Sequence, residues 1–249
     1  MLIYQNRVPL HDIIKKENWN RDMTIGILTA MSVEFRQVAA MLGNAQEEKH
    51  GTQTYLVGML GEHKVVLQQC GIGKVNAACG VTQMLMQYQP DCVISTGVAG
   101  GIDSKLHVMD VVVSNQVCYH DVWCGEGCDP GQVQGLPTFF PCDKVMLEKA
   151  LQVDADVKVL PGLICTGDRF ITAREELDKI KQDYPEGLAV DMESCAIAQV
   201  CHIFGVPFIS FRIISDTPGA EAHFEQYQNF WETMADKSFL VTKTFLNSL

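Results

Sequence analysis

The stretch from Leu188 to Gly219 carries charged side chains at the ends of two apolar runs. Asp191 and Glu193 follow the first run, and Asp216 follows the second, which is β-branched and aromatic. Between the runs, apolar residues recur at spacings of three and four, which predicts a helix. Strand, helix, strand is the unit of a parallel sheet, in which ligands bind outside the carboxyl ends of strands. Carboxyl groups there can move protons or accept hydrogen bonds from a ligand, which favours an enzyme over a scaffold.

Each of these residues also has a purely structural interpretation. Glu193 suits the first turn of a helix, where the helix dipole stabilises a carboxylate. Asp216 suits the turn before Pro218. Arg212, the one charge within the second run, suits a structural counter-ion. Together they favour function, because a buried strand rarely carries a charge without a partner or a task.

Composition narrows the class of protein. The chain has 249 residues, a normal apolar content of 47% and a formal net charge of −11, which disfavours a nucleic-acid partner. No apolar run approaches the length of a membrane span, and the N-terminal segment lacks the apolar region and cleavage site of a signal peptide. We therefore expect a cytoplasmic protein with no nucleic-acid partner and no membrane partner.

Ten cysteines are present. Several lie in apolar runs and are typical of small buried hydrophobes in a reducing compartment, namely Cys70, Cys92, Cys165 and Cys201. Four others crowd the region around His120 and Asp121, namely Cys118, Cys124, Cys128 and Cys142. A zinc site is conceivable there, but the Cys124–Cys128 spacing lacks a matching second pair, so we predict no metal.

Strands and helices are expected to alternate along the chain. Strands are predicted at 23–28, 54–60, 64–70, 92–97, 108–114, 159–166, 188–190 and 206–214. A first helix is predicted to begin within 29–34, and further helices are predicted at 74–90, 143–152, 173–182 and 194–204. One or two more are predicted within 221–249, with a short helical turn at 10–16. Glycine-rich turns are expected at 71–74, 98–101 and 167, and a long loop at 119–141.

This order predicts an α/β protein, a single-domain three-layer α/β/α fold around a central mixed β-sheet. Residues 1–22 form an N-terminal extension, and 23–249 form the catalytic domain. None of the glycine-rich turns matches GxGxxG or GxxxxGK[ST], so neither a dinucleotide nor a P-loop nucleotide site is supported. We predict no cofactor.

Six motifs in order resemble the nucleoside phosphorylase/nucleosidase superfamily, and most closely its bacterial 5′-methylthioadenosine/S-adenosylhomocysteine nucleosidases. The motifs are IGILTAMSVEF, CGIGKVNAA, STGVAGGID, VVVSNQVCYHD, GLICTGDRFI and AVDMESCAIAQVCHIFGVPFISFRIISD. The resemblance covers roughly residues 23–249. It implies the nucleoside phosphorylase fold, cleavage of an N-glycosidic bond in a small-molecule nucleoside substrate, no cofactor, and a homodimer.

The resemblance also implies roles for individual residues. Glu34 matches the glutamate that activates the attacking water, and Asp216 matches the aspartate that protonates the purine at N7. Met192 and Glu193 match the pair that contacts the ribose, and Asp191 precedes them. The remaining matches are Ser215 and Arg212 beside Asp216, Phe170 and Ile171 at the purine, Met31 and Ile72 in the apolar pocket, and Ala99 and Gly100 in the turn beside the purine.

The chain departs from the family pattern at three places. Asp191 stands where a glutamate is usual, so its reach to the ribose or to Arg212 is shorter. Val98 stands where many relatives have serine. The 119–141 loop lacks the aromatic pair that relatives contribute across a dimer interface to the alkylthio pocket, and Trp123, Phe139 or Phe140 would have to substitute for it. These departures concern the 5′-substituent more than the purine.

Water is the expected nucleophile. Phosphorylases of the superfamily carry an arginine shortly before the glycine-rich turn and a hydroxyl within it, and this chain has Ser95 and Val98 at those positions. An anion site without such donors is poor. Three alternatives remain open: a purine nucleosidase of futalosine type, a phosphorylase, and a nucleoside-binding protein without turnover.

Overall fold

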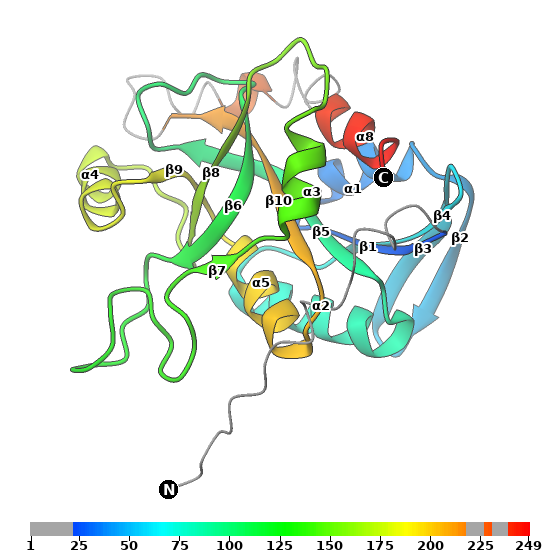
Figure 1. Cartoon of the computed structure of the whole chain (residues 1–249), viewed down its shortest axis with the longest axis horizontal. Coiled ribbons are helices and arrows are strands. Elements are labelled where there is room, and N and C mark those ends of the chain that lie inside the picture. The colour runs from blue at the N-terminus through cyan, green and yellow to red at the C-terminus, as the bar shows by residue number, and fades with distance from the viewer. Residues whose placement is uncertain (1–21, 218–226, 231–238) are drawn as a thin grey trace, which may run out of the picture.

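The computed structural model describes residues 22–217, 227–230 and 239–249 of the chain (Figure 1). The predicted helical turn at 10–16 lies outside these residues, and the boundary between an extension and a catalytic domain stays a prediction. In the C-terminal region predicted as helical, residues 227–230 are helical and α8 spans Leu240–Leu246. Within the described residues, no helix is long and apolar enough to cross a bilayer.

Within the described residues, ten strands form one mixed sheet. They are β1 (Thr24–Thr29), β2 (Gly43–His50), β3 (Gln53–Leu60), β4 (His63–Gln69), β5 (Cys92–Gly101), β6 (Val111–Tyr119), β7 (Phe140–Pro141), β8 (Val159–Thr166), β9 (Gly187–Asp191) and β10 (Phe208–Asp216). The order across the sheet is β10-β6-β8-β9-β5-β1-β4-β3-β2, and β7 pairs with β6.

Strand β5 joins the two parts of the sheet. Its first residues, Cys92–Ser95, pair in parallel with β1, whereas Gly100 and Gly101 at its end pair with β9. Strand β10 runs parallel to β5 along most of its length. Strand β5 pairs with β1 only over its first residues, so the ends of β1 and β5 separate. A crevice between separating strand ends is the usual place for a ligand in an α/β sheet.

Five strands close into a ring. Strand β10 pairs with β6, β6 with β8, β8 with β9 and β9 with β5, which returns to β10. Closure leaves no unpaired edge within the ring, so the ends of β5, β9 and β10 are held at fixed positions relative to one another.

Helices cover both faces of this sheet. They are α1 (Ser32–Ala39), α2 (Lys74–Tyr88), α3 (Lys144–Ala150), α4 (Arg174–Asp183), α5 (Ser194–Phe204) and α8. The ring of Phe211 in β10 packs on Phe245 of α8 with centroids 4.8 Å apart, whereas the Ser210 hydroxyl hydrogen-bonds Ser194 of α5. Successive strand residues face opposite sides, so α8 and α5 lie on opposite faces. Together with the comparisons below, this arrangement confirms the predicted fold class.

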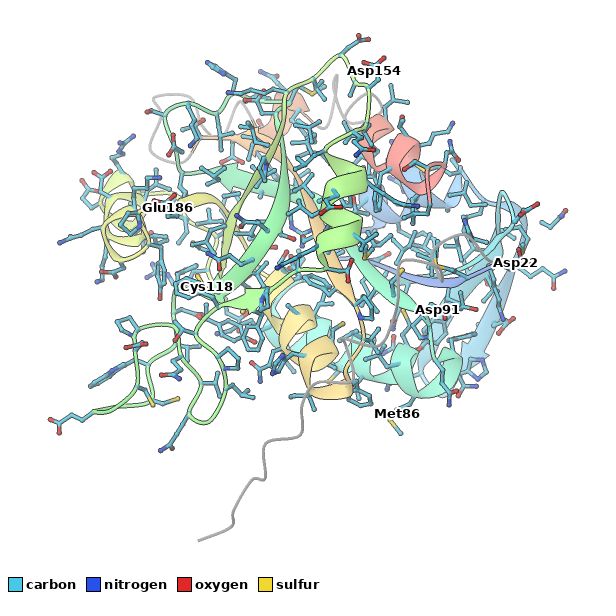
Figure 2. All side chains as sticks on the ribbon, in the orientation of Figure 1. Asp22, Met86, Asp91, Cys118, Asp154 and Glu186 are labelled. Carbon is cyan, nitrogen blue, oxygen red and sulfur yellow. The ribbon has the colours of Figure 1, made fainter. Side chains whose placement is uncertain are left out.

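The apolar strands are buried and the charged residues face outward. Val93, Ile94, Phe211 and Ile214 are fully enclosed, and burial of such side chains is the main favourable term in folding. Figure 2 shows charged side chains such as Asp154 at the surface, where it is exposed.

Several predicted bounds differ from the structure by one or two residues, and those of β5 and β6 differ by more. The segment Val98–Gly101, expected as a turn, continues β5, because its backbone pairs with β10 and β9. Strand β6 begins at Val111 rather than at 108 and runs on to Tyr119. Met109 has φ 82°, outside the extended region, so the ladder starts after it.

Strand β2 was not expected at all. Its sequence, GNAQEEKH, has no apolar alternation, and most of its residues are exposed. It lies at the edge of the sheet and pairs only with β3 among the described strands. A strand that buries neither face leaves no periodic apolar signal in the sequence.

Candidate active site

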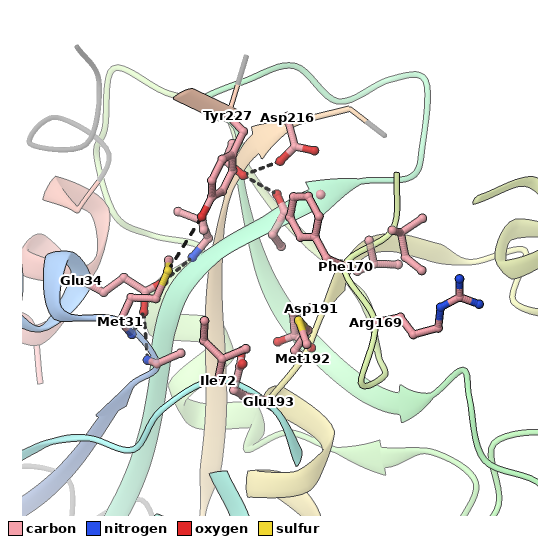
Figure 3. Close-up of a pocket in the computed structure, with 17 residues that line it drawn as sticks. Met31, Glu34, Ile72, Arg169, Phe170, Asp191, Met192, Glu193, Asp216 and Tyr227 are labelled. Atoms are coloured by element: carbon pink, nitrogen blue, oxygen red, sulfur yellow. Dashed lines mark hydrogen bonds between the residues drawn. The ribbon is translucent and has the colours of Figure 1, made fainter. Parts of the chain in front are cut away.

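A pocket of about 630 Å³ opens where β5 leaves β1 (Figure 3). Segments following β1 and β9, the ends of β5 and β10, the loops before α2 and α4, and Tyr227 form its walls. The predicted site residues that line it are Met31, Glu34, Ile72, Ala99, Gly100, Phe170, Ile171, Asp191, Met192, Glu193, Ser215 and Asp216. Arg212, the remaining predicted residue, lies behind the pocket.

Glu34 lies in the first turn of α1 with its carboxylate held by three backbone N–H groups. Oε2 accepts hydrogen bonds from Ala30 and Met31 at 2.9 Å each, and Oε1 accepts one from Val98 at 3.1 Å. A Cβ on Gly97 would lie 2.6 Å from Oε1, so glycine lets β5 approach this closely. Burial raises the pKa of Glu34, although these donors oppose the shift, so the group accepts a proton more readily than an exposed glutamate.

Arg212 is the buried charge within β10. Its Nε donates to Asp191 Oδ2 at 2.7 Å, and its Nη2 donates to Ser95 Oγ at 2.9 Å. Nη2 also lies 3.9 Å from Glu193 Oε2. Burial alone would lower the pKa of Arg212, but the surrounding carboxylates of Asp191, Glu193 and Glu34 raise it above its ordinary value. Arg212 therefore stays charged and supplies the positive field of the site.

Asp191, at the end of β9, is bound to the protein through both carboxylate oxygens. Oδ1 accepts a hydrogen bond from the Thr166 hydroxyl at 2.5 Å, and Oδ2 accepts from Ser194 N–H at 3.1 Å as well as from Arg212. The shorter aspartate thus reaches Arg212. This network makes Asp191 part of the pocket floor, where it orients the guanidinium.

Glu193 is the residue at the N-cap of α5 and faces the pocket. Its Oε1 accepts a hydrogen bond from Gly73 N–H at 2.9 Å, which ties the end of β9 to the start of α2. Burial, followed by the charge of Asp191, raises the pKa of Glu193 to about 7, while Arg212 opposes the shift. The carboxyl is therefore close to half protonated near neutral pH.

Asp216 ends β10 at the opposite side of the pocket from α5 and is 2% exposed. The Ser215 hydroxyl donates to its Oδ1 at 2.7 Å and lies 3.4 Å from the Ala99 carbonyl oxygen. The register between β10 and β5 shifts between Ile214 and Asp216. A bulge of this kind re-aims a side chain at the end of a strand, here toward the pocket.

An apolar wall faces these polar groups (Figure 3). The rings of Phe170 and Tyr227 pack edge to face with centroids 5.6 Å apart, and the Tyr227 hydroxyl donates to the Met31 sulfur at 3.8 Å. The side chains of Phe170 and Ile72 are about half exposed. Exposed apolar side chains at the rim of a pocket are suited to contact a flat, apolar ligand.

Sequence reasoning missed five lining residues. Ala30, Val98 and Val190 adjoin predicted residues, and that adjacency was the signal available for them. Arg169 precedes Phe170, but its side chain points away and pairs with Glu176. Tyr227 comes from the C-terminal region, whose apolar pattern indicates a helix but marks no residue as facing the pocket.

A second cavity of about 190 Å³ adjoins the pocket behind Glu34. Ala30, Glu34 and Glu193 line both spaces. Arg212 and the polar side chains of Ser95, Thr96, Thr29 and Cys70 line the rear cavity. Such a polar, enclosed space is suited to water.

The cysteines considered as metal ligands do not come together. Cys118 and Cys142 are buried, whereas Cys124 is exposed. In the part of the chain that the structure describes, no three His, Cys, Asp or Glu side chains are grouped as metal ligands.

The comparisons with known proteins agree with this geometry. The sequence profile of the Phosphorylase superfamily matches residues 24–247. A 5′-methylthioadenosine/S-adenosylhomocysteine nucleosidase of Chromohalobacter salexigens is 40% identical over 229 residues, which cover 90% of this chain and 97% of that one. The chain belongs to the 5′-methylthioadenosine/S-adenosylhomocysteine nucleosidase family. This confirms the family predicted from the motifs.

Solved structures show the same fold. A nucleosidase of this family from Colwellia psychrerythraea, in complex with adenine, has a TM-score of 0.86 at 35% identity, covering 92% of this chain and 96% of that one. A futalosine hydrolase of Helicobacter pylori has a TM-score of 0.84 at 26% identity, covering 91% and 98%. The fold is therefore shared by a 5′-methylthioadenosine/S-adenosylhomocysteine nucleosidase and a futalosine hydrolase.

Proposed function

We propose that this protein hydrolyses the N-glycosidic bond of 5′-methylthioadenosine, S-adenosylhomocysteine or both, releasing adenine and the 5′-thioribose. One observation supports the proposal most: three buried carboxyl groups line the same pocket, namely those of Glu34, Glu193 and Asp216. Membership of the family supports the class of substrate. Cleavage passes through an oxocarbenium-like sugar, which needs an acid for the leaving base and a base for the attacking water.

Glu34 is the base in this proposal. It lies between the pocket and the rear cavity, where a water molecule would stand beside its carboxylate. Its raised pKa makes it a better proton acceptor than an exposed glutamate, and its three backbone donors fix its orientation. Water held there attacks C1′ of the ribose as the proton passes to Glu34.

Asp216 is the acid and protonates N7 of the leaving adenine. The hydrogen bond from Ser215 fixes its carboxyl group. The purine lies between Phe170, which stacks on it, and the small residues Ala99 and Gly100, whose backbone it approaches closely. Ile171 recognises the adenine edge through its backbone.

The ribose and its 5′-group occupy the other end of the pocket. Glu193 accepts hydrogen bonds from the ribose hydroxyls when it is ionised, and Met192 contacts the sugar. Met31 and Ile72 offer apolar surface to the 5′-alkylthio group. Asp191 acts through Arg212, whose charge holds the neighbouring carboxylates in place.

Hydrolysis is favoured over phosphorolysis. The rear cavity contains Arg212, but the carboxylates of Glu34 and Glu193 line it as well. Two carboxylates beside one guanidinium disfavour a phosphate dianion and are compatible with neutral water.

Release of the purine base from methylthioadenosine, S-adenosylhomocysteine, adenosine and futalosine, each with and without phosphate, tests the proposal. We expect phosphate-independent release from the two thio-substituted nucleosides, and a loss of at least about a hundredfold in kcat for Asp216→Asn, because the amide cannot deliver a proton. Release that requires phosphate, preference for the futalosine, or binding without release would each contradict the proposal.

We also propose that the protein is a homodimer, as expected from the family resemblance. Exposed apolar side chains near the start of α2 support this, namely those of Ile72 and Val75, which are 51% and 72% exposed. The cytoplasmic location stays a prediction.

A further inference from the structure

A charged cluster with no role in the chemistry above lies beside the mouth of the pocket. Lys74, the first residue of α2, donates from Nζ to both oxygens of Asp121 at 2.8 Å. Its backbone N–H donates to Asp168 Oδ1 at 2.7 Å. The Asp168 N–H in turn donates to Asp121 Oδ2 at 2.8 Å. The three residues, here called the Lys74 cluster, form a closed set of contacts.

The cluster joins three segments that are far apart in the sequence. Asp121 belongs to the loop after β6, Lys74 to the start of α2, and Asp168 to the loop between β8 and α4. Asp168 lies two residues before Phe170, and Lys74 lies two residues after Ile72, and both of these apolar residues line the pocket. The cluster therefore determines the relative position of two pocket walls.

Two glycines allow the segments to lie so close. A Cβ on Gly167 would lie 2.4 Å from His120 Nε2, and a Cβ on Gly73 would lie 3.0 Å from Asp168 Oδ1. Gly73 also has φ +96°, a conformation that side chains rarely adopt. Its N–H donates to Glu193. The turn at Gly73 therefore contacts both the Lys74 cluster and the carboxylate proposed to face the ribose.

The charges make the lysine essential to the cluster. Its side chain and that of Asp121 are each 22% exposed, and that of Asp168 is 44% exposed. One ammonium stands between two carboxylates, with Nζ 3.9 Å from Asp168 Oδ2. Burial lowers the pKa of the adjacent His120, so it adds no dependable positive charge. Removing the ammonium leaves two carboxylates repelling each other across the junction.

We propose that Lys74, Asp121 and Asp168 are positioning residues that lock the loop carrying Phe170 and Ile171 against the start of α2. This inference rests on the proposed function, since it assumes that these walls hold the purine nucleoside. The cluster touches none of the reacting atoms. Its loss is expected to weaken binding of the purine while the groups that act on the bond stay in place.

Lys74→Met tests the proposal, with Lys179→Met as the matched control. Lys179 makes a similar pair with Asp183 at 3.0 Å on α4, but its side chain is 75% exposed and lines neither cavity. For Lys74→Met we expect the KM for methylthioadenosine and the Kd for adenine to rise about tenfold, with kcat within about threefold of wild type. Lys74→Arg is expected to recover most of the binding, and Lys179→Met to match wild type.

Several outcomes would overturn the proposal. They are an unchanged adenine Kd, a fall in kcat without a change in KM, or failure of Lys74→Arg to recover binding. A further such outcome is that Lys74→Met sediments as a smaller species than wild type, because loss of the oligomer would then explain the weaker binding. If Lys74→Met does not fold, Asp121→Asn replaces it, with a smaller rise of about threefold expected in both constants because one acceptor oxygen remains. Adenine binding is measured by calorimetry without turnover, so the test holds even if the wild type cleaves none of the nucleosides tried.

Discussion

At Glu193, burial and the neighbouring charge of Asp191 oppose ionisation. This residue is 7% exposed and faces Asp191 across the floor of the pocket, and only Arg212 and one backbone donor favour its charged form. A carboxyl group whose pKa is raised on folding binds more protons in the folded protein than in the unfolded chain. Its ionisation therefore costs stability.

This has a measurable consequence for the dependence of stability on pH. The pKa of Glu193 rises from 4.5 to about 7, so its contribution favours the folded state below about pH 4.5 and is lost as pH rises toward 7. Over that range, ionisation of Glu193 should lower the free energy of unfolding of the wild type by an amount on the order of 3 kcal/mol. We expect the Glu193→Gln variant to lack this decrease. The measurement is the free energy of unfolding by urea at pH 5 and pH 8.

The matched control is Glu62→Gln in the exposed turn between β3 and β4, which should leave the difference between the two pH values as in wild type. If Glu193→Gln shows the same difference as wild type, the carboxyl is not desolvated as the structure indicates.

At the scale of the element, β5 places three parts of the site. Its Gly97 lies against Glu34, its Val98 donates to that carboxylate, and its residues Ala99 and Gly100 line the pocket. We expect Gly97→Ala to displace the Glu34 carboxylate, because a Cβ would lie 2.6 Å from Oε1. The result should be a folded protein whose kcat falls by about tenfold to a hundredfold.

Gly43→Ala is the control for that variant. Gly43 also lies in a strand, where a Cβ would meet its nearest neighbour at an ordinary 3.7 Å, so kcat and KM should stay near wild type. A Gly97→Ala protein with unchanged kcat would show that the position of the Glu34 carboxylate does not limit the reaction.

The elements also show what the sequence can predict. Strand β8 was predicted with its correct bounds, because apolar residues lie on both sides of Pro161 and Gly162 and the strand ends before Gly167. The polar edge strand β2 left none. The 98–101 segment was expected as a turn but is part of strand β5. Glycines occur both in turns and in strands that another group approaches closely, so glycine content does not distinguish the two.

The site was predictable for a related reason. Most of its residues lie at strand ends and in motifs that keep their order along the chain, so their meeting follows from the fold. Tyr227 was missed because its place at the pocket depends on contacts with residues distant in the sequence, such as Met31 and Phe170, which no local pattern specifies. Neither the Lys74 cluster nor the closure of the ring was expected, since each depends on contacts between segments distant in sequence.

At the scale of the whole molecule, the pocket lies beside an exposed apolar surface at the start of α2. Val75 is 72% exposed and follows Ile72, which lines the pocket and is itself 51% exposed. Such side chains mark a contact surface when they gather near a binding site. A second copy bound there would shield the apolar end of the pocket, where the 5′-alkylthio group is placed in the proposal above.

The proposed dimer gives the last prediction. We expect the wild type to sediment as a dimer at micromolar concentration and Val75→Glu to sediment as a monomer, because a charge buried in an apolar interface is strongly disfavoured. The KM for methylthioadenosine should rise more than that for adenosine, which lacks the alkylthio group. Met86→Glu is the control: Met86 is 70% exposed on the same helix but lies eleven residues away, about 16 Å along its axis. A wild type that sediments as a monomer, or a Val75→Glu variant that remains dimeric, would show that this surface does not join two copies of the chain.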